Sequence, residues 1–500
     1  MSTSSLDSQL TESQPTVRRI VYYFLSLALS GYLLLWVAIF NGYAIFFPDS
    51  GEYLGVSFYW QPAIYRTISY SIFIRLVSFG TSPWLVIIAQ SVIVIFVLHS
   101  VFKFILRENV PFEREGLLFL GLILFLTFGT TLPWFVGQIM PDVFTGLAML
   151  SLFLLLYDSG MSVVRTALLS AVLCLSVATH ITHLLTVAFL LLAIVVFRLF
   201  AAFRMFWPAR SPKGIVAFVL VPVLAISGLL TLSNWSSGYG FSLSPARPIF
   251  LLGRLMESGM AADYLQQRCA VEEFTACKYL HNLPKSSEEL LWRANPLFNE
   301  MGGWSGGRSE ASRIVSGTIW HRPVRFAAEC VKQMFRQFVA MGAGSGNYAL
   351  RSGPEIEGFL ELYPGDVRRY LATRQSIGKL AMDGYRWSFL YVAVFWCSFG
   401  VCLIVLFAKR LRARIADQLF VFTVIFLFAN AFATGALSIV NDRYQARAAW
   451  LMGLCCAAYL LSWFGSSLIN GYSLATPSKT LVGSALPRQT LGAVLRRGRQ

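Results

Sequence analysis

The sequence predicts an all-α polytopic membrane protein with about 10 transmembrane helices, interfacial helices and one mainly helical extracytoplasmic domain. Three observations support this fold class. Of the 500 residues, 56% are hydrophobic and only 13% are charged, whereas about a quarter of the residues in soluble domains are charged. Apolar runs long enough to cross a bilayer recur along the chain, and Lys and Arg gather in alternate connecting segments. One large water-soluble globule is therefore not expected.

The apolar runs set the predicted spans, because a helix needs roughly 20 apolar residues to cross ~30 Å of hydrocarbon. The runs are 20–41, 84–106, 116–136, 142–158, 163–179, 181–200, 214–233, 387–408, 417–439 and 446–466. The stretch from Arg66 to Gly80 is too short to cross and carries Arg66 and Arg75, so we expect an interfacial helix there. The first run is too long for the core of a signal peptide and is expected to remain as a helix.

Charge placement predicts the orientation. The formal net charge is +16, from 41 Lys and Arg against 25 Asp and Glu. With a cytoplasmic N-terminus, the basic residues outside 234–383 fall mostly in inner segments, as in the run Lys409, Arg410, Arg412 and Arg414. This positive-inside pattern accounts for the basic excess without nucleic acid as a partner. Both termini are then cytoplasmic and 234–383 lies outside.

The chain is expected to divide into five parts. These are a disordered cytoplasmic tail (1–17), an N-terminal transmembrane module (18–233), an extracytoplasmic domain (234–383), C-terminal transmembrane helices (384–466) and a cytoplasmic tail (467–500). The stretch 234–383 has nearly balanced charges, and its helical patches Phe250 to Gln267 and Ser312 to Val339 are separated by glycine-rich turns. Cys269 and Cys277 fall in this domain and could form a disulfide in an oxidising compartment.

Four acids fall in short outer loops, namely Asp49, Glu52, Asp142 and Asp442. No Asp, Glu, Lys or Arg lies near the middle of a predicted span. An ion-coupled transporter usually carries such a group there, so its absence counts against a pump. Acids collected at one membrane face favour chemistry at that face.

Asp49 follows the first span, and Glu52 comes three residues later. One interpretation is an ordinary helix start, in which Asp49 accepts the N3 amide and Glu52 closes a capping box. The other interpretation makes Asp49 a general base at a cleft roofed by the membrane. The two are compatible, because Glu52 can cap the helix while Asp49 faces a substrate.

Asp142 and the two histidines of the next outer turn are further candidates. Asp142 follows Pro141, and an acid at a helix start is favoured by the helix dipole, but it could also bind a divalent cation or orient a substrate hydroxyl. His180 and His183 are spaced for metal ligation on one helical face. They could equally form a polar turn with one ring bonded to the backbone, or contact a substrate. Asp49, Asp142 and His183 are the candidate metal ligands.

The last outer loop contains Arg443, Tyr444 and Arg447. Arginines that snorkel beside an interfacial tyrosine are common at membrane surfaces. These two cations lie on the predicted outer face, which should be poor in Lys and Arg. They would also suit a phosphate ligand, because a guanidinium offers forked hydrogen bonds to phosphate oxygens.

The order of these features resembles the GT-C superfamily of integral-membrane glycosyltransferases, which use polyprenyl-phosphate-linked sugars. The motifs are Phe47 to Ser50 after the first span, the aromatic patch Tyr59 to Arg66, an interfacial helix, the span start Trp84 to Gln90, Asp142 in the second outer loop, and Arg443-Tyr444 before the last span. The resemblance covers 20–200 and 440–466. The chain departs from many members in lacking a second acid next to Asp49, and in having one acid in the second loop where metal-dependent members often have more.

The resemblance implies a function. The module 18–233 would transfer a sugar from a polyprenyl-phosphate donor to an unknown acceptor at the outer face of the bacterial inner membrane, with inversion. Asp49 would be the general base. The substrate would be bound by Glu52, Arg66, Asp142, His180, His183, Arg443, Tyr444 and Arg447. A divalent cation is the one cofactor considered, and no nucleotide is needed, in agreement with the absence of a glycine-rich phosphate loop.

Three other hypotheses remain open. An O-antigen ligase or polymerase also combines many spans with a large outer loop, but relies on Arg and His in its loops. A non-catalytic lipid or polysaccharide transporter predicts paired repeats and polar groups along a transmembrane path. A purely structural assembly partner would tolerate simultaneous changes at Asp49 and Arg443.

Overall fold

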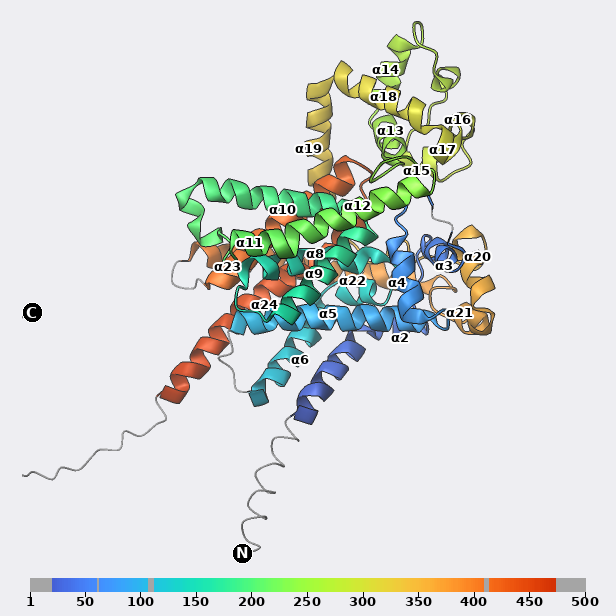
Figure 1. Ribbon diagram of the computed structural model, residues 1–500. Coiled ribbons are helices and arrows are strands. Elements are labelled where there is room, and N and C mark those ends of the chain that lie inside the picture. The colour runs from blue at the N-terminus through green and yellow to red at the C-terminus, as the bar shows by residue number, and fades with distance from the viewer. Residues whose placement is uncertain (1–19, 61–62, 107–111, 409–412, 474–500) are drawn as a thin grey trace, which may run out of the picture.

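The computed structural model describes residues 20–60, 63–106, 112–408 and 413–473 (Figure 1). Every regular element in these residues is a helix, apart from an isolated parallel bridge between Ile45 and Gln138. The prediction of an all-helical protein is therefore confirmed for the described part of the chain. The predicted tail 1–17, the basic run 409–412 and the last predicted tail from residue 474 onward lie outside the described residues.

Six helices are long and apolar enough to cross a membrane, and the protein is a multi-pass membrane protein. They are Pro83–Leu106 (α5), Ile181–Leu199 (α10), Pro212–Ser236 (α11, η3 and α12), Lys379–Phe407 (α22), Arg414–Ala436 (α23 and η7) and Asp442–Trp463 within α24 (Asp442–Ser473). Shorter apolar helices occupy three more of the predicted runs, at Ile20–Leu34, Pro141–Tyr157 (η1 and α8) and Val163–Thr179 (α9). The helix α6 (Phe112–Gly129) falls on the remaining run.

The other helices are shorter and connect or cover these. Near the first part of the chain they are α2 (Trp36–Asn41), α3 (Ser50–Tyr59), α4 (Ser69–Ser78), α7 (Leu132–Val136) and η2 (Ala201–Phe206). Between α12 and α22 they are α13 (Arg247–Glu257), α14 (Met260–Arg268), η4 (Thr275–Tyr279), α15 (Ser287–Leu291), α16 (Pro296–Glu300), α17 (Gly303–Gly306), α18 (Arg308–His321), α19 (Pro323–Val339), α20 (Pro354–Leu362), η5 (Pro364–Asp366) and α21 (Val367–Leu371). The predicted interfacial helix forms as α4, which is too short to cross a bilayer.

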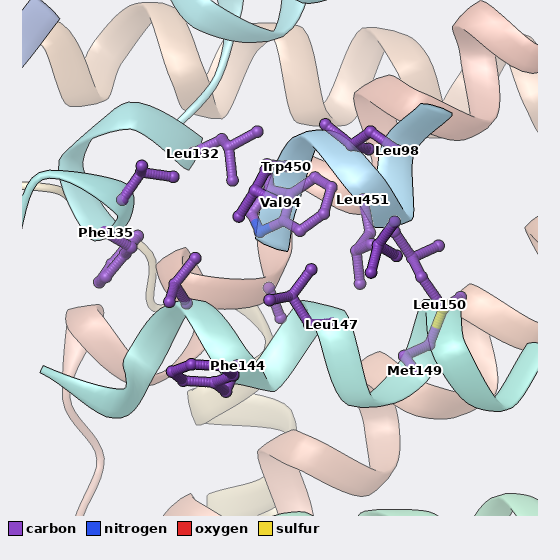
Figure 2. Packing of buried hydrophobic residues seen from close by; sticks show 14 of the residues in the cluster. Val94, Leu98, Leu132, Phe135, Phe144, Leu147, Met149, Leu150, Trp450 and Leu451 are labelled. Carbon is purple, nitrogen blue, oxygen red and sulfur yellow. The ribbon is translucent and has the colours of Figure 1, made fainter. Parts of the chain in front are cut away.

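The helix α8 (Phe144–Tyr157) forms the centre of the main hydrophobic core, since all of its residues are buried. A helix that is apolar on every side must be surrounded by other helices. Trp450 of α24 packs against α8 at Gly146, where an added Cβ would lie 2.4 Å from Cζ2 of the indole. Figure 2 shows this ring beside Val94 of α5 and Leu147 of α8. The small Gly146 therefore lets the last long helix approach the centre of the bundle.

The stretch predicted as the outer domain contains a second hydrophobic core. Its buried residues run from Ile249 to Val315, whereas the apolar residues from Phe338 to Leu380 belong to the main core. Figure 1 shows α13 to α18 gathered at one end of the long helices. A disulfide joins Cys269 and Cys277, so the predicted pairing is confirmed.

Both predicted helical patches in this stretch are broken into two helices for local reasons. The first breaks between α13 and α14 at Gly259, whose φ of 72° is one that glycine adopts without steric cost. The second breaks between α18 and α19 at Arg322, because Pro323 follows and disfavours helical backbone at the residue before it.

Backbone hydrogen bonds bring together the two connecting segments that contain Asp49 and Asp142. The Ile45 amide donates to the Gly137 carbonyl at 2.9 Å, and the Ile139 amide donates to the Ile45 carbonyl at 2.9 Å. The Ser50 hydroxyl donates to the Ile139 carbonyl at 2.7 Å, which ties the start of α3 to the same segment. Gln90 of α5 supports the second strand-like segment by donating to the Gln138 carbonyl at 2.9 Å. These bonds determine where Asp49 and Asp142 lie.

Candidate functional site

Asp49 and Glu52 both bind the guanidinium of Arg66. Nη2 of Arg66 lies 2.6 Å from Oδ1 of Asp49, and its Nε bonds Oε2 of Glu52. All three side chains are partly buried, with exposed fractions between 15% and 26%. The prediction that Asp49 caps α3 is wrong, because its side chain accepts no backbone amide of that helix. The ion pair with Arg66, which lies in the α3–α4 connection, takes up the carboxylate instead.

A second cluster is formed by Asp142 between Arg443 and Arg447, which lie in the first turns of α24 and not in a loop as predicted. Nη1 of Arg447 lies 3.0 Å from Oδ1 of Asp142, and Nε of Arg443 lies 3.6 Å from Oδ2. The side chains of Asp142 and Arg447 are 1% and 0% exposed. A buried charge is costly unless it is paired, so Asp142 and the two arginines depend on one another. One interpretation of the sequence was that these arginines snorkel into solvent. The structure shows instead that both are buried.

This second cluster has buried donors that the described residues do not satisfy. Arg443 is 6% exposed, and its Nε and Nη1 have no hydrogen-bond partner among those residues. The same holds for Nε of Arg447 and Oδ2 of Asp142. Leaving a buried donor unpaired costs about 1–3 kcal/mol, and more for a charged group. Nε of Arg443 faces the Asp142 carboxylate at 3.6 Å, so an anion placed against Arg443 would satisfy its Nη1.

Aromatic rings hold Arg443 in place. Its guanidinium carbon lies 3.7 Å from the centroid of the Phe47 ring and 5.4 Å from that of Tyr444. Arg447 contacts the other side of the cluster, with its guanidinium carbon 5.3 Å from the Tyr444 centroid. Such stacking fixes an arginine without using its hydrogen-bond donors. Arg443 is therefore positioned while its N–H groups stay available.

Tyr53 of α3 lies between the two clusters. The guanidinium carbon of Arg66 is 5.2 Å from its ring centroid. Burial raises the pKa of Tyr53 to about 12, with Arg66 opposing the increase and the carboxylates of Asp49 and Asp142 adding to it. The geometric link between the clusters is Phe47, two residues before Asp49, whose ring contacts Arg443.

His183 has both ring nitrogens engaged within the protein. Its Nδ1 lies 2.6 Å from the Ser176 carbonyl, which can only accept, so Nδ1 carries the proton. Its Nε2 then accepts from the Thr145 hydroxyl at 2.7 Å. The interpretation of a polar turn with one histidine bonded to the backbone is therefore confirmed. His183 has no nitrogen left for a metal or a substrate.

His180 is the residue before α10 and adopts extended backbone angles, so it does not share a helical face with His183. Its Nδ1 lies 2.8 Å from the Thr182 hydroxyl. Thr182 in turn lies 3.5 Å from Nη2 of Arg447, which connects the histidine turn to the second cluster.

A small cavity of about 70 Å³ lies beside the first cluster. Its walls include Tyr53, Tyr65, Arg66, His180 and Asn234. Burial raises the pKa of Tyr65, and a hydrogen bond to Glu52 acts in the same direction. Arg66 thus faces a cavity on one side and two carboxylates on the other.

The candidate metal ligands do not form a metal site. In the part of the chain that the structure describes, no group of three or more His, Cys, Asp and Glu side chains could hold a metal ion. His183 is fully hydrogen-bonded, and Asp142 lies between two guanidinium groups whose positive charge disfavours a cation at its carboxylate. The sequence analysis missed Asn430 of α23, whose amide oxygen lies 3.3 Å from Nη2 of Arg447. A polar amide within the apolar run 417–439 is the signal that could have indicated it.

Comparison with protein-family models, with curated proteins and with solved structures finds no match to this chain. The candidate site therefore rests on its own geometry.

Proposed function

We propose that this protein transfers a sugar from a polyprenyl-phosphate donor to an acceptor at the outer face of the membrane. The observation that carries the proposal is Arg443, a buried guanidinium whose Nη1 has no hydrogen-bond partner among the described residues and which stacks on Phe47, two residues before Asp49. A phosphate is the anion that best uses a forked guanidinium. A nearby carboxylate is the kind of group that accepts a hydroxyl proton during attack.

Each residue then has a proposed role. Arg443 binds the donor phosphate, while Asp142, Arg447 and Tyr444 position Arg443 through charge and stacking. The ion pair with Glu52 keeps Arg66 in place, so that Asp49 can leave its own ion pair with Arg66 when substrate enters. His180 borders the cavity in which Arg66 lies.

The reaction is a single displacement with inversion. The acceptor hydroxyl oxygen attacks the anomeric carbon, and its proton moves to Asp49. The bond between the anomeric carbon and the phosphate oxygen breaks, and its electron pair stays on the phosphate that Arg443 stabilises. General-base assistance contributes on the order of 10²–10⁴ in rate, and stabilisation of the leaving anion adds an electrostatic contribution.

The topology belongs to the same proposal. All ten apolar runs would lie in the bacterial inner membrane, with both termini in the cytoplasm and 234–383 in the periplasm. The disulfide between Cys269 and Cys277 supports an oxidising compartment for that stretch. The placement of the basic segments supports the same orientation.

The test is photoaffinity labelling with a diazirine-bearing polyprenyl monophosphate, on the full-length protein in lipid nanodiscs. The wild-type protein should be labelled, and unlabelled polyprenyl monophosphate should compete. Arg443→Met should reduce labelling at least about tenfold, since a charge-assisted contact to phosphate contributes roughly 1.5–3 kcal/mol. Arg386→Met is the matched control, because Arg386 is an exposed arginine of α22. Equal labelling of the wild-type protein and both variants would refute the proposal.

A further inference from the structure

A cavity of about 400 Å³ lies at the end of the helix bundle opposite to the site described above. It is bordered by the last turns of α5 and α8 and by the first turns of α9 and α23. Lys103, Arg165 and Arg414 line it together with the connection Asp158 to Met161. These residues lie where apolar helices end, so the cavity is at a membrane–water boundary.

Two of the three cations in this cavity make no ion pair with the described residues, although the carboxylate-bearing Asp158 lines the same cavity. Lys103 is paired, since its Nζ lies 2.9 Å from Oε2 of Glu115. The side chains of Arg165 and Arg414 make no ion pair or hydrogen bond with the described residues. Two arginines of like charge that line one cavity repel each other, and an anion between them would remove that repulsion.

The backbone adds to the positive potential. Arg165 is in the first turn of α9 and Arg414 is the first residue of α23, so the N-terminal ends of two long helices meet at the cavity. Helix N-termini favour anions through their free amides and their dipoles. The residue before α23, Ala413, provides no side-chain cap for those amides. At the C-terminal end of α8, which also borders the cavity, Nη2 of Arg210 donates to the Asp158 carbonyl at 2.8 Å.

We propose that this cavity binds a phosphate-bearing anion at the membrane surface. Basic pockets between transmembrane helices on the cytoplasmic side are typical sites for phospholipid headgroups. The same chemistry could be supplied by a soluble phosphate ester, and the experiment below separates the two sources. The site is independent of the proposed sugar transfer, because it shares no residue with the outer site.

The test is the thermal stability of the purified full-length protein in neutral detergent. Phosphatidylglycerol is titrated in one arm and glycerol 3-phosphate in another, with phosphatidylcholine as the uncharged lipid. Saturable stabilisation by phosphatidylglycerol is expected. Its apparent affinity should fall about thirtyfold in Arg165→Gln/Arg414→Gln, because each arginine near a membrane surface contributes roughly a fivefold gain in affinity.

The matched control is Arg204→Gln/Lys213→Gln, which removes two exposed cations outside the cavity, one in η2 and one in α11. It should keep wild-type affinity. Stabilisation by glycerol 3-phosphate that the cavity variant also loses would support the site with a soluble ligand. Equal loss in both double variants, or equal stabilisation by phosphatidylcholine, would overturn the proposal. If the cavity variant does not fold, Arg414→Gln alone should reduce affinity about fivefold, since Arg414 is exposed.

Discussion

The guanidinium carbon of Arg443 lies over the ring of Phe47, 3.7 Å from its centroid. Phe47 comes two residues before Asp49, whereas Arg443 is the second residue of α24, the last long helix that the structure describes. The contact therefore sets the distance between a proposed base and a proposed phosphate ligand that are far apart in sequence. The predictions below test this geometry and the elements that support it.

Asp49→Asn should abolish sugar transfer while leaving the fold and polyprenyl-phosphate labelling intact. The amide keeps the shape of the side chain but cannot accept the acceptor proton, and a loss of about 10²–10⁴ in rate is expected. Envelope glycans and glycolipids of a deletion strain complemented with each variant would be compared by mass spectrometry. Asp442→Asn, which changes an exposed acid at the start of α24, is the control and should restore the wild-type profile. Full activity of Asp49→Asn would contradict the base mechanism.

Asp142→Asn should destabilise the protein by about 3–5 kcal/mol, because it leaves two buried arginines without their counter-ion. Reversible unfolding of the protein in mixed micelles would measure the loss. Asp442→Asn again serves as the control and should change stability by less than about 0.5 kcal/mol. A neutral Asp142→Asn would mean that the arginines are solvated or paired differently.

Gly346→Ala should displace Phe47 and with it Arg443. An added Cβ would lie 1.7 Å from Cε2 of Phe47, at a backbone φ of +78°. Gly240→Ala is a close control, since its φ is +85° but nothing lies within 4 Å of the added Cβ. Both variants carry the strain of a left-handed residue, about 1 kcal/mol. Only Gly346→Ala should also reduce polyprenyl-phosphate labelling, and equal labelling of the two would argue against Phe47 as the support of Arg443.

Two glycines of α3 should respond in opposite directions. Gly51→Ala would place a Cβ 2.3 Å from the Glu355 carbonyl oxygen, so α3 and α20 must separate, at a cost of about 1–3 kcal/mol. Gly55→Ala meets nothing within 4 Å and should stabilise the helix by about 0.5–1 kcal/mol. Melting temperatures in detergent would show the difference. A stabilising Gly51→Ala would show that α20 does not pack on α3 in solution.

Removal of the disulfide with Cys269→Ser/Cys277→Ser should lower the stability of the segment that has the second hydrophobic core. The closed loop is short, so a loss near the lower end of the usual range, about 2 kcal/mol, is expected. Limited proteolysis should then cut between α14 and η4 first, while the long helices remain protected. Treatment of the wild-type protein with a reductant should reproduce the effect. Unchanged proteolysis would indicate that the cysteines are reduced in the native protein.

Much of the fold follows from local sequence. The apolar runs indicated the positions of the long helices, because helix length and hydrophobicity are properties of contiguous residues. The ends of the helices were harder to predict from the sequence. The capping box expected at Asp49 was wrong, because Arg66 is closer to the carboxylate than any free amide of α3. That competition depends on the course of the α3–α4 connection.

The candidate site divides in the same way. The sequence indicated which ionisable residues are unusual, since acids and arginines in short outer loops of an apolar chain stand out. It did not reveal that Asp142 is enclosed by Arg443 and Arg447, or that His183 is fully used by Ser176 and Thr145. These partners are far apart along the chain or hidden in apolar runs.

By itself the amino-acid sequence determined that the chain is a helical, multi-pass membrane protein, because the free energy of burying long apolar runs is additive along the chain. Tertiary structure decided which charges neutralise one another and which donors stay free. That outcome depends on distances of a few ångströms between residues hundreds of positions apart, such as Asp142 and Arg447 at 3.0 Å. Electrostatic energy in a buried site changes steeply over such distances, and no local pattern records them.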